Sequence, residues 1–380
     1  MGIKEVTRRK FIRNVATTFG ACRLLPLHSA IPSAEKGSAQ YDAPTTPLKD
    51  QAARKGLLYG SCVQRKQLTS DSALEGITVA QCGIVVPEVA LKWDHLRPSP
   101  TTYDFADADW LLNFAQQNQM KFRAVPIIWH EALPRWFAEY MSPQNAKQLL
   151  LDHISTVVGR YASTMHSWDV VNEVISPDDK RADGLRDTPW LRNLGPGHIE
   201  MAFRAVHEAD TNALLTWNEN WLEEDSALGD AKRGFLLQHL KDFLSRGVPV
   251  QAIGLQSHIF GDHANVAGPH FREFLSQITD MGLKIIITEM DIRERTFPND
   301  IAARDQATAF AYHHYLHTVL EHKSVIAVLT WGLSDKYTWL TQHDPRADKA
   351  PVRPLPYDAN VQPKPARYAI AHAFDQAPSR

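Results

Sequence analysis

Short apolar runs alternate with longer amphipathic segments along this chain from about residue 55 onward. The runs are short and rich in apolar or β-branched residues, which predicts strands, whereas the segments between them have the length of helices. The expected strands begin at residues 56–63, 83–86, 122–129 and 167–174, and continue at 213–218, 250–257, 283–288 and 325–331. The expected helices include residues 106–120, 143–162, 198–209, 232–246, 271–281 and 303–321.

This alternation predicts parallel βα units. About eight units follow one another without a Pro/Ser-rich linker, which favours the α/β class and a single closed (β/α)₈ barrel, the TIM barrel. An open doubly wound sheet is the alternative. No glycine-rich phosphate-binding fingerprint follows the first expected strand, so that alternative lacks its usual support.

The first 40 residues have the pattern of an export signal and linker. A basic segment at residues 7–13 precedes a modestly apolar stretch at 15–27, and small residues follow. That order is typical of a signal peptide and not of a membrane span. The pair Arg8 and Arg9 before Phe11 resembles a bacterial twin-arginine signal, the alternative being a basic tail with a chance Arg-Arg pair. We expect a periplasmic or secreted protein with its folded domain at residues 41–380.

Charge and cysteine content restrict the partners. The 41 Lys and Arg residues against 43 Asp and Glu residues give a net charge of -2, which offers no electrostatic case for nucleic acid or an anionic membrane. No other stretch approaches the ~20 apolar residues of a transmembrane helix. Cys62 and Cys82 could pair in an oxidising compartment or remain buried free thiols. Three cysteines are too few for a zinc-thiolate site.

The carboxyl ends of barrel strands form the active face of this fold. Glu173 ends the fourth expected strand and Glu289 ends the seventh, close to Asp291. The remaining strand ends carry amides, histidines and tryptophans, namely Gln256, His258, Trp129, His130, Trp217, Asn218 and Trp331. Two carboxylates, a histidine, amides and tryptophans around one mouth suit carbohydrate chemistry.

Two carboxyl groups in different environments are what glycosidic bond cleavage requires. One must protonate the leaving oxygen while the other, ionised, stabilises an oxocarbenium-like carbon. Opposite positions in one barrel would let Glu173 and Glu289 face each other across a bound sugar. The alternative is that each is a solvated carboxylate at a strand end, which we would favour for either glutamate alone but not for both with these neighbours.

Five stretches along nearly the whole expected folded domain carry a family resemblance. They are residues 168–173 (WDVVNE), 254–258 (GLQSH), 287–292 (ITEMDI), 330–339 (TWGLSDKYTW) and 362–366 (QPKPA). Each is moderately specific, and all of them in this order are highly specific. From about residue 55 to 372 the chain resembles the family 10 glycoside hydrolases, which are (β/α)₈ endo-β-1,4-xylanases.

The resemblance implies a role for each matching residue. Glu173 matches the acid/base, Glu289 the nucleophile, and Asn172 the amide that holds a sugar 2-hydroxyl. His258 resembles the residue that hydrogen-bonds the nucleophile, a satisfied structural histidine being the alternative. The remaining matches are Asp291 steadying His258, Gln256 in the same network, Trp331 and Trp339 as aromatic walls, Glu88 and Lys92 as hydroxyl-binding groups, and Trp129 as the strand-three tryptophan.

These roles imply a retaining endo-β-1,4-glycanase that hydrolyses xylan by double displacement. Retaining enzymes hold their carboxyl groups ~5–5.5 Å apart, and we expect that spacing for Glu173 and Glu289. We expect no cofactor and no metal, a polysaccharide partner, no nucleic acid, no membrane span and a monomeric protein.

Three departures from the family pattern bear on the substrate. Val89, Val125 and Ala132 each place an apolar side chain where the family has a hydroxyl-binding group on the glycone side. A site that no longer hydrogen-bonds a sugar hydroxyl discriminates less for it. Two interpretations are open. One is a xylanase of low activity whose sequence has diverged, and the other is a hydrolase with altered specificity for another β-glycan or a glycoconjugate.

Two rival functions come from other classes. A carbohydrate-binding protein without catalysis is opposed by the presence of Glu173 and Glu289. A metal enzyme would need a site such as His313 and His317, which lie four residues apart on an expected helix. That helix belongs to the outer ring, so we interpret the pair as a solvated surface and expect activity to survive chelators.

Overall fold

The computed structural model describes residues 46–380. The expected export signal and linker at residues 1–40, with Arg8 and Arg9, lie outside the described residues. None of the helices in the described part of the chain is long and apolar enough to span a membrane.

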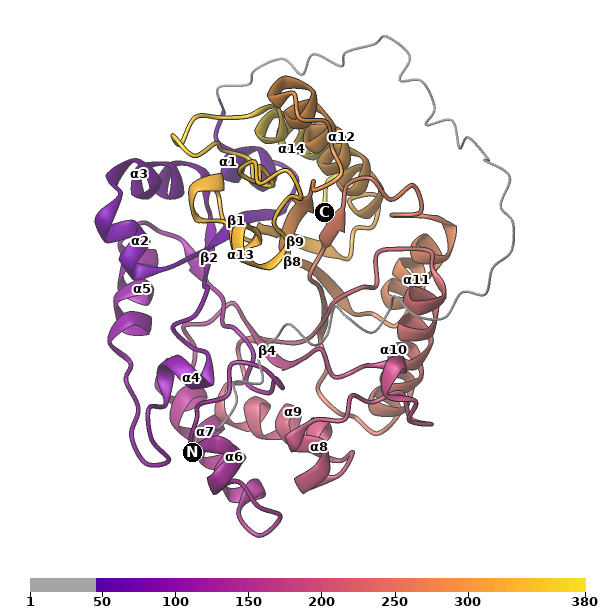
Figure 1. Ribbon diagram of the computed structural model, residues 1–380. Helices are drawn as coiled ribbons and strands as arrows, with labels where there is room; N and C mark the ends of the chain where they lie inside the picture. Colours follow the sequence, from indigo (N-terminus) through magenta and orange to yellow (C-terminus); the bar gives the residue numbers. More distant parts are fainter. Residues whose placement is uncertain (1–45) are drawn as a thin grey trace. The chain divides into compact units, whose positions relative to one another are not determined.

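The described residues form a parallel sheet that curls into a (β/α)₈ barrel, as the sequence predicted (Figure 1). Within the described residues the strand order is β3-β2-β1-β9-β8-β6-β5-β4, with β7 paired to β8. The strands are β1 (Leu58–Val63), β2 (Ile84–Pro87), β3 (Lys121–Phe122), β4 (Ser167–Asn172), β5 (Leu214–Glu219), β6 (Ala252–Leu255), β7 (His258–Phe260), β8 (Lys284–Arg293) and β9 (Val325–Thr330).

The barrel closes between the third and fourth strands. Regular pairing of β3 ends at Phe122, seven residues before the end of the third expected strand at residue 129. The chain nevertheless continues alongside β4, because the Ala124 amide donates to the Ser167 carbonyl (3.0 Å) and the Ile127 amide to the Asp169 carbonyl (2.8 Å). Pro126 lies between these two bonds and has no amide hydrogen, so it interrupts the ladder.

A ring of helices surrounds the strands (Figure 1). The longer ones match the expected helices to within a few residues at most ends: α5 (Ala106–Gln117), α7 (Ala146–Tyr161), α9 (His198–Ala209), α10 (Ala227–Ser245), α11 (Pro269–Asp280) and α12 (Ile301–Val319). Two further helices of ten and twelve residues, α3 (Ser72–Gln81) and α14 (Pro365–Gln376), were not among the expected helices named above. Shorter helices are α1 (Leu48–Ala53), α2 (Arg65–Ser70), α4 (Trp93–Leu96), α6 (Phe137–Tyr140), α8 (Pro189–Leu194) and α13 (Leu340–His343), with 3₁₀ turns at η2 (Pro177–Asp179) and η3 (Asp335–Tyr337).

Apolar burial on both sides of the sheet explains why the strands are continuous apolar runs. All six residues of β4 and all four of β6 are buried. Parallel strands covered by helices need no polar face, which is why polar and apolar residues alternate only weakly within the strand sequences. Cys62 in β1 and Cys82 after α3 are buried free thiols, so the buried-thiol alternative is correct and the disulfide alternative is not.

Candidate active site

Glu173 follows the last residue of β4 in a left-handed backbone conformation, with φ of 54°. A non-glycine residue in this region is uncommon and is held by its surroundings. The Glu173 amide donates to the Asn218 carbonyl (3.0 Å), and Arg186 Nε donates to the Glu173 carbonyl (2.6 Å). These two bonds fix the backbone from which the Glu173 carboxylate projects.

Glu289 lies within β8 where its register against β9 shifts. The pairing changes between Ile287 and Met290, so Glu289 occupies the irregular step. Such bulges turn a side chain away from the regular alternation and are common beside active sites. Its amide donates to the Gln256 carbonyl (3.1 Å), and its side chain is 13% exposed, the same fraction as that of Glu173.

Three amide side chains connect these two carboxylates. Asn218 Nδ2 donates to Glu289 Oε1 (2.8 Å) and to Asn172 Oδ1 (2.8 Å). Gln256 Nε2 donates to Glu173 Oε1 (2.9 Å) and to the same Asn172 oxygen (3.2 Å). A continuous hydrogen-bonded chain therefore joins Glu173 to Glu289 through Gln256, Asn172 and Asn218, which places both carboxylates in one site.

His258 stands between two carboxylates. Its Nδ1 lies 3.0 Å from Asp291 Oδ1, and its Nε2 lies 3.5 Å from Glu289 Oε2. Burial lowers the pKa of His258, but Asp291 and Glu289 outweigh it and raise that pKa to about 9. An imidazolium at neutral pH donates from both ring nitrogens, so His258 holds Glu289 from one side while Asn218 holds it from the other.

A bend after β6 brings both Gln256 and His258 to this site. The sequence predicted one strand through residue 257, whereas β6 ends at Leu255 and β7 begins at His258. Ser257 between them has φ of 61°, and its amide donates to Glu223 Oε1 (2.8 Å). In a regular strand Gln256 and His258 would share a face because they lie two residues apart. Here the bend at Ser257 separates them into the end of β6 and the start of β7 and still brings both to the site.

Trp339 reaches the same network from the loop after β9. Its indole Nε1 donates to Asp291 Oδ2 (2.7 Å), and its ring centroid lies 4.9 Å from that of His258. Asp291 is fully buried and accepts from both residues. The tryptophan is half-buried, so one aromatic surface stands at the edge of the site while its polar edge is fixed.

Lys92, Trp129 and Trp331 form a second group. The Lys92 ammonium nitrogen lies 5.1 Å from the Trp129 ring centroid and 5.7 Å from that of Trp331. Glu88 accepts a hydrogen bond from Gln64 Nε2 (2.8 Å), and burial raises its pKa although Gln64 and Lys92 oppose the shift. Lys92 and the two tryptophans thus present one cation between aromatic faces, the surface that a neutral sugar can stack on and hydrogen-bond.

His130 joins this second group to Glu173. Its ring centroid lies 6.1 Å from that of Trp129, and its Nε2 lies 4.0 Å from Glu173 Oε2. Burial lowers the pKa of His130 to about 4, with Arg186 contributing. Burial raises the pKa of Glu173, but the Gln256 hydrogen bond and the charges of His130 and Arg186 bring it below its usual value. Glu173 is therefore ionised at neutral pH in the ligand-free protein.

Val89, Val125 and Ala132 have different surroundings. Val125 is 2% exposed and belongs to the hydrophobic core, so it offers little surface to a ligand. Val89 and Ala132 are half-buried. Ala132 has φ of 49°, and its carbonyl accepts from the Asp94 amide (2.9 Å) at the start of α4. Of the three, Val89 and Ala132 are the positions that a sugar could contact.

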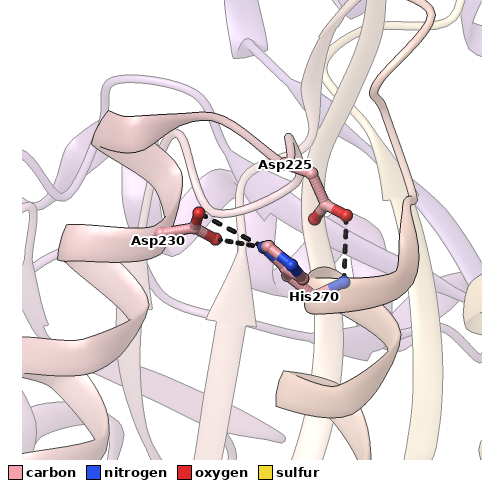
Figure 2. Close-up of side chains that lie close together, drawn as sticks. All are labelled: Asp225, Asp230 and His270. Atoms are coloured by element: carbon pink, nitrogen blue, oxygen red, sulfur yellow. Dashed lines mark hydrogen bonds and ion pairs between the residues drawn. The ribbon is translucent and has the colours of Figure 1, made fainter.

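A group with metal-ligand chemistry is formed by the loop after β5 and the first turns of α10 and α11. In the described residues, Asp225, Asp230 and His270 bring ligand atoms within 4.8 Å of one another (Figure 2). Arg233 Nη2 donates to Asp225 Oδ1 (3.3 Å) and also to Asp230 Oδ1. Asp225 accepts the backbone amides of His270 and Phe271 (both 2.9 Å) at the start of α11. Arg233 offsets part of the negative charge of the two carboxylates, and Asp225 caps α11, so these contacts account for the group without a cation.

The structure brings together the site residues that the sequence predicted and adds others with no predicted role, among them Asn218 and Arg186. Asn218 links Asn172 to Glu289, and Arg186 holds the Glu173 carbonyl. The end of the fifth expected strand already placed Asn218 at the barrel mouth. Arg186 follows no strand, and no signal in the sequence connects it to Glu173.

Comparisons with known proteins point to one family. Residues 47–373 match the sequence model of glycosyl hydrolase family 10. The chain is 31% identical over 367 residues to endo-1,4-beta-xylanase 3 of Hypocrea jecorina, covering 92% of this chain and 96% of that protein. It is 33% identical over 311 residues to a thermostable celloxylanase of Thermoclostridium stercorarium, covering 76% and 78%. Xylanase 10B from Thermotoga petrophila RKU-1, solved in complex with xylobiose, is similar with a TM-score of 0.80 and 30% identity, covering 88% of this chain and 98% of that one.

Proposed function

This chain belongs to glycosyl hydrolase family 10, and from that membership we propose that it hydrolyses the β-1,4 bonds within xylan with retention of configuration. It is a glycoside hydrolase with a (β/α)₈ barrel. The relatives that match most of the chain carry the names of endo-1,4-β-xylanases, and one structurally similar xylanase was solved with xylobiose.

One observation carries the assignment of the residues. Glu173 and Glu289 come from β4 and β8, on different sides of the barrel, and a single chain of three amides joins their carboxylates. The amides leave each carboxylate an oxygen that no amide bonds, Oε2 in both cases. Two fixed carboxylates with differing neighbours are what glycosidic cleavage requires.

In the first step, Glu289 attacks the anomeric carbon while Glu173 protonates the leaving oxygen. The Asn218 amide holds Oε1 of Glu289 and the His258 imidazolium lies beside Oε2, so the orientation of the carboxylate is fixed before the attack. Glu173 must carry a proton at this point, and its ionised state in the ligand-free protein has to change on binding. A bound glycan excludes water from the carboxylate, and loss of hydration raises a carboxyl pKa.

In the second step, Glu173 removes a proton from water, and the resulting nucleophile breaks the bond between the sugar and Glu289. The glycosylated Glu289 is neutral, so it no longer opposes the negative charge of Glu173. The Gln256 hydrogen bond and the charge of Arg186 favour the ionised Glu173 that this step uses. The surroundings of Glu173 therefore favour its role as a base.

The other predicted residues serve the sugar. Asn172 uses Oδ1 for two hydrogen bonds, so we propose that its NH₂ group donates to a sugar 2-hydroxyl. Lys92 and Glu88 supply hydroxyl-binding groups on the glycone side. The rings of Trp129, Trp331 and Trp339 supply the aromatic walls.

Hydrolysis of defined glycans tests this function. Purified protein is incubated with xylan, with xylooligosaccharides and with a panel of other β-glycans, and the products are separated. We expect internal cleavage of xylan and a first-formed product with retained configuration. Glu289→Ala should lose this activity, since the nucleophile is gone, while Glu273→Ala on the outer helix α11 should keep it.

Covalent trapping distinguishes a hydrolase from a binding protein. A mechanism-based fluorosugar should add one glycosyl group to the wild-type protein at Glu289, seen by peptide mass spectrometry. Equal hydrolysis by wild type and Glu289→Ala would refute the nucleophile assignment. Absence of turnover on xylan together with turnover of another β-glycan would move the substrate to the alternative class that Val89 and Ala132 suggest.

We also propose that the protein acts as a monomer outside the bacterial cytoplasm, exported through Arg8 and Arg9. A twin-arginine signal depends on both arginines. Replacing both by lysine should retain the protein in the cytoplasm, whereas lysine at Arg13 alone should not. Light scattering of the secreted protein should give the mass of one chain.

A further inference from the structure

Glu223 is a buried carboxyl group that the hydrolysis described above does not use. It lies in the loop between β5 and α10 and is 5% exposed. Its Oε1 accepts the Ser257 amide (2.8 Å). Burial raises the pKa of Glu223, and the Ser257 amide and the nearby charge of His258 oppose the shift. Burying a carboxyl group costs free energy unless hydrogen bonds compensate, so its presence here indicates that the contact with Ser257 matters.

The loop holds the backbone of Glu223 in place. Arg233 Nη1 on α10 donates to the carbonyls of both flanking residues, Leu222 (2.5 Å) and Glu224 (2.9 Å). The Glu223 carbonyl itself accepts from the Ala267 amide (2.9 Å). Three consecutive carbonyls are therefore bonded, and the Arg233 side chain that bonds two of them is only 4% exposed. The carboxyl group of Glu223 thus projects from a fixed support.

Ser257 is the residue that this support holds. It is fully buried, and its φ of 61° is a left-handed conformation that a non-glycine residue adopts only when its surroundings impose it. A buried amide without an acceptor costs free energy, and Glu223 provides the acceptor. The Ser257 hydroxyl lies 2.7 Å from the Tyr315 hydroxyl on α12, which adds a second contact from the outer ring.

This bend carries one partner of each proposed catalytic carboxylate. Gln256 precedes Ser257, and its Nε2 donates to Glu173 Oε1 (2.9 Å). His258 follows Ser257, and its Nε2 lies 3.5 Å from Glu289 Oε2. A change in the backbone at Ser257 would therefore move both contacts at once.

We propose that Glu223 is a positioning residue, which accepts the Ser257 amide and thereby fixes the bend that aligns the partners of both carboxylates. This role rests on the proposed hydrolase function and adds to it a residue outside the five stretches that carry the family resemblance. The bond to Ser257 needs an acceptor oxygen and no negative charge. An amide at position 223 should therefore serve, whereas an apolar side chain of similar length should not.

Steady-state kinetics of full-chain variants, on a glycan that the wild type hydrolyses, test this role. Glu223→Met should lower kcat by about 10- to 100-fold, since displacement of a catalytic group by about 1 Å can cost that much, and should change KM by less than about twofold. Glu223→Gln should restore most of kcat. Glu224→Ala changes the next residue of the loop, whose carboxylate bonds His263 instead, and should leave both constants unchanged.

The pH profile separates positioning from a loss of stability. In Glu223→Met the Gln256 amide is no longer held against Glu173, so the pKa of Glu173 should rise. The other charged and titratable groups beside Glu173, His130 and Arg186, keep their places. The alkaline limb of kcat should therefore move to higher pH in Glu223→Met and return in Glu223→Gln. In a Gln256→Leu background, Glu223→Met should move the limb no further, because the donor is already gone.

Carbon-13 NMR of labelled glutamate carboxyl groups measures the pKa of Glu173 without substrate, so it tests the positioning role even if no glycan is hydrolysed. Glu173→Gln assigns the resonance. A raised pKa in Glu223→Met, with wild-type values in Glu223→Gln and Glu224→Ala, is the expected result. A wild-type pKa in folded Glu223→Met, or the same shift in Glu224→Ala, would overturn the proposal.

A second variant covers the case in which Glu223→Met does not fold, as judged by circular dichroism. Glycine adopts a φ of 61° without strain, so Ser257→Gly combined with Glu223→Met removes the strain that the lost bond would otherwise have to hold. The pKa of Glu173 should be raised in this double variant as well. A wild-type value there would overturn the proposal.

Discussion

The side-chain amide of Asn218 on β5 donates a hydrogen bond to the carboxylate of Glu289 on β8, with Nδ2 2.8 Å from Oε1. The orientation of that amide is itself fixed, because Thr288 Oγ1 donates to Asn218 Oδ1 (2.8 Å) and Asn172 accepts from the second Nδ2 hydrogen. Asn218 is fully buried. One side chain thus orients the proposed nucleophile and links it to the amide beside Glu173.

Asn218→Ala should lower kcat/KM for xylan by about 10- to 150-fold, because a hydrogen bond to a charged group contributes about 1.5–3 kcal/mol. Steady-state kinetics on xylooligosaccharides measure the effect. Asn212→Ala, an exposed asparagine that bonds Ser163, is the control and should leave the rate unchanged. A wild-type rate for Asn218→Ala would mean that Glu289 needs no orientation by this amide.

Gln256→Leu should move the alkaline limb of the pH profile of kcat to higher pH. Gln256 donates to ionised Glu173 and so lowers its pKa, and removing that donor raises the pKa. The general acid must be protonated, so activity falls as pH rises through its pKa, and a higher pKa delays the fall. The overall rate should drop as well, but the shift of the limb is the diagnostic result. A limb that stays in place or moves to lower pH would contradict the assignment of Glu173 as the acid.

The free energy of unfolding should fall as pH rises through about 9, because His258 loses its proton there. Its pKa is about 9 in the folded chain and about 6.5 when unfolded. A raised pKa gives stabilisation that is fully present below the unfolded value and lost as pH passes the folded value. Urea unfolding between pH 6 and 10 measures the fall. Asp291→Asn removes a main cause of the raised pKa, so its loss should occur at lower pH, and identical curves for the two proteins would refute this origin.

The sequence alone predicted that Glu173 and Glu289 share one site, and the reason lies in the barrel. Strand ends of parallel βα units meet at one face, so Glu173 and Glu289 could be assigned to one site without coordinates. His258 and Asp291 followed from the same rule, and the structure places them 3.0 Å apart. These placements follow from the topology of the barrel. The alternation of apolar runs and amphipathic segments in the sequence predicts that topology directly.

What the sequence could not supply depends on side-chain direction and on loops. Asn218 was placed at the mouth, but its bond to Glu289 depends on how the side chain turns. The bend at Ser257 and the break at Pro126 change where strands end without changing the apolar pattern. His372 is 59 residues from His313 along the chain and meets it only because α14 packs on α12.

Arg186→Ala should lower kcat more than it changes KM, by about tenfold in kcat. The guanidinium donates to the Glu173 carbonyl, and Glu173 has a left-handed backbone conformation, so Arg186 positions the proposed acid/base and has no proposed contact with the sugar. Arg186→Lys should recover part of the rate, because one donor remains. Arg181→Ala, an exposed arginine paired with Asp183 in the same loop, is the control. A rise in KM with unchanged kcat would instead make Arg186 a substrate-binding residue.

Arg123→Met should destabilise the barrel by about 3–5 kcal/mol above pH 7, and less near pH 5. Arg123 and Asp169 form an ion pair between side chains that are 1% and 2% exposed, and removing one partner leaves the other charge buried. Burial raises the pKa of Asp169 to about 7, with Arg123 opposing the shift, so without Arg123 the carboxyl binds its proton more tightly. A carboxyl whose folded pKa is raised destabilises the fold as pH rises toward that value, and a still higher value extends this cost above pH 7. Near pH 5 the carboxyl is already protonated in both proteins, which leaves only the lost contact.

Urea unfolding at pH 5 and pH 8 measures both values, and Arg123→Met with Asp169→Leu should recover much of the loss at pH 8. Equal destabilisation at the two pH values would show that lost packing, not the unpaired carboxylate, is responsible.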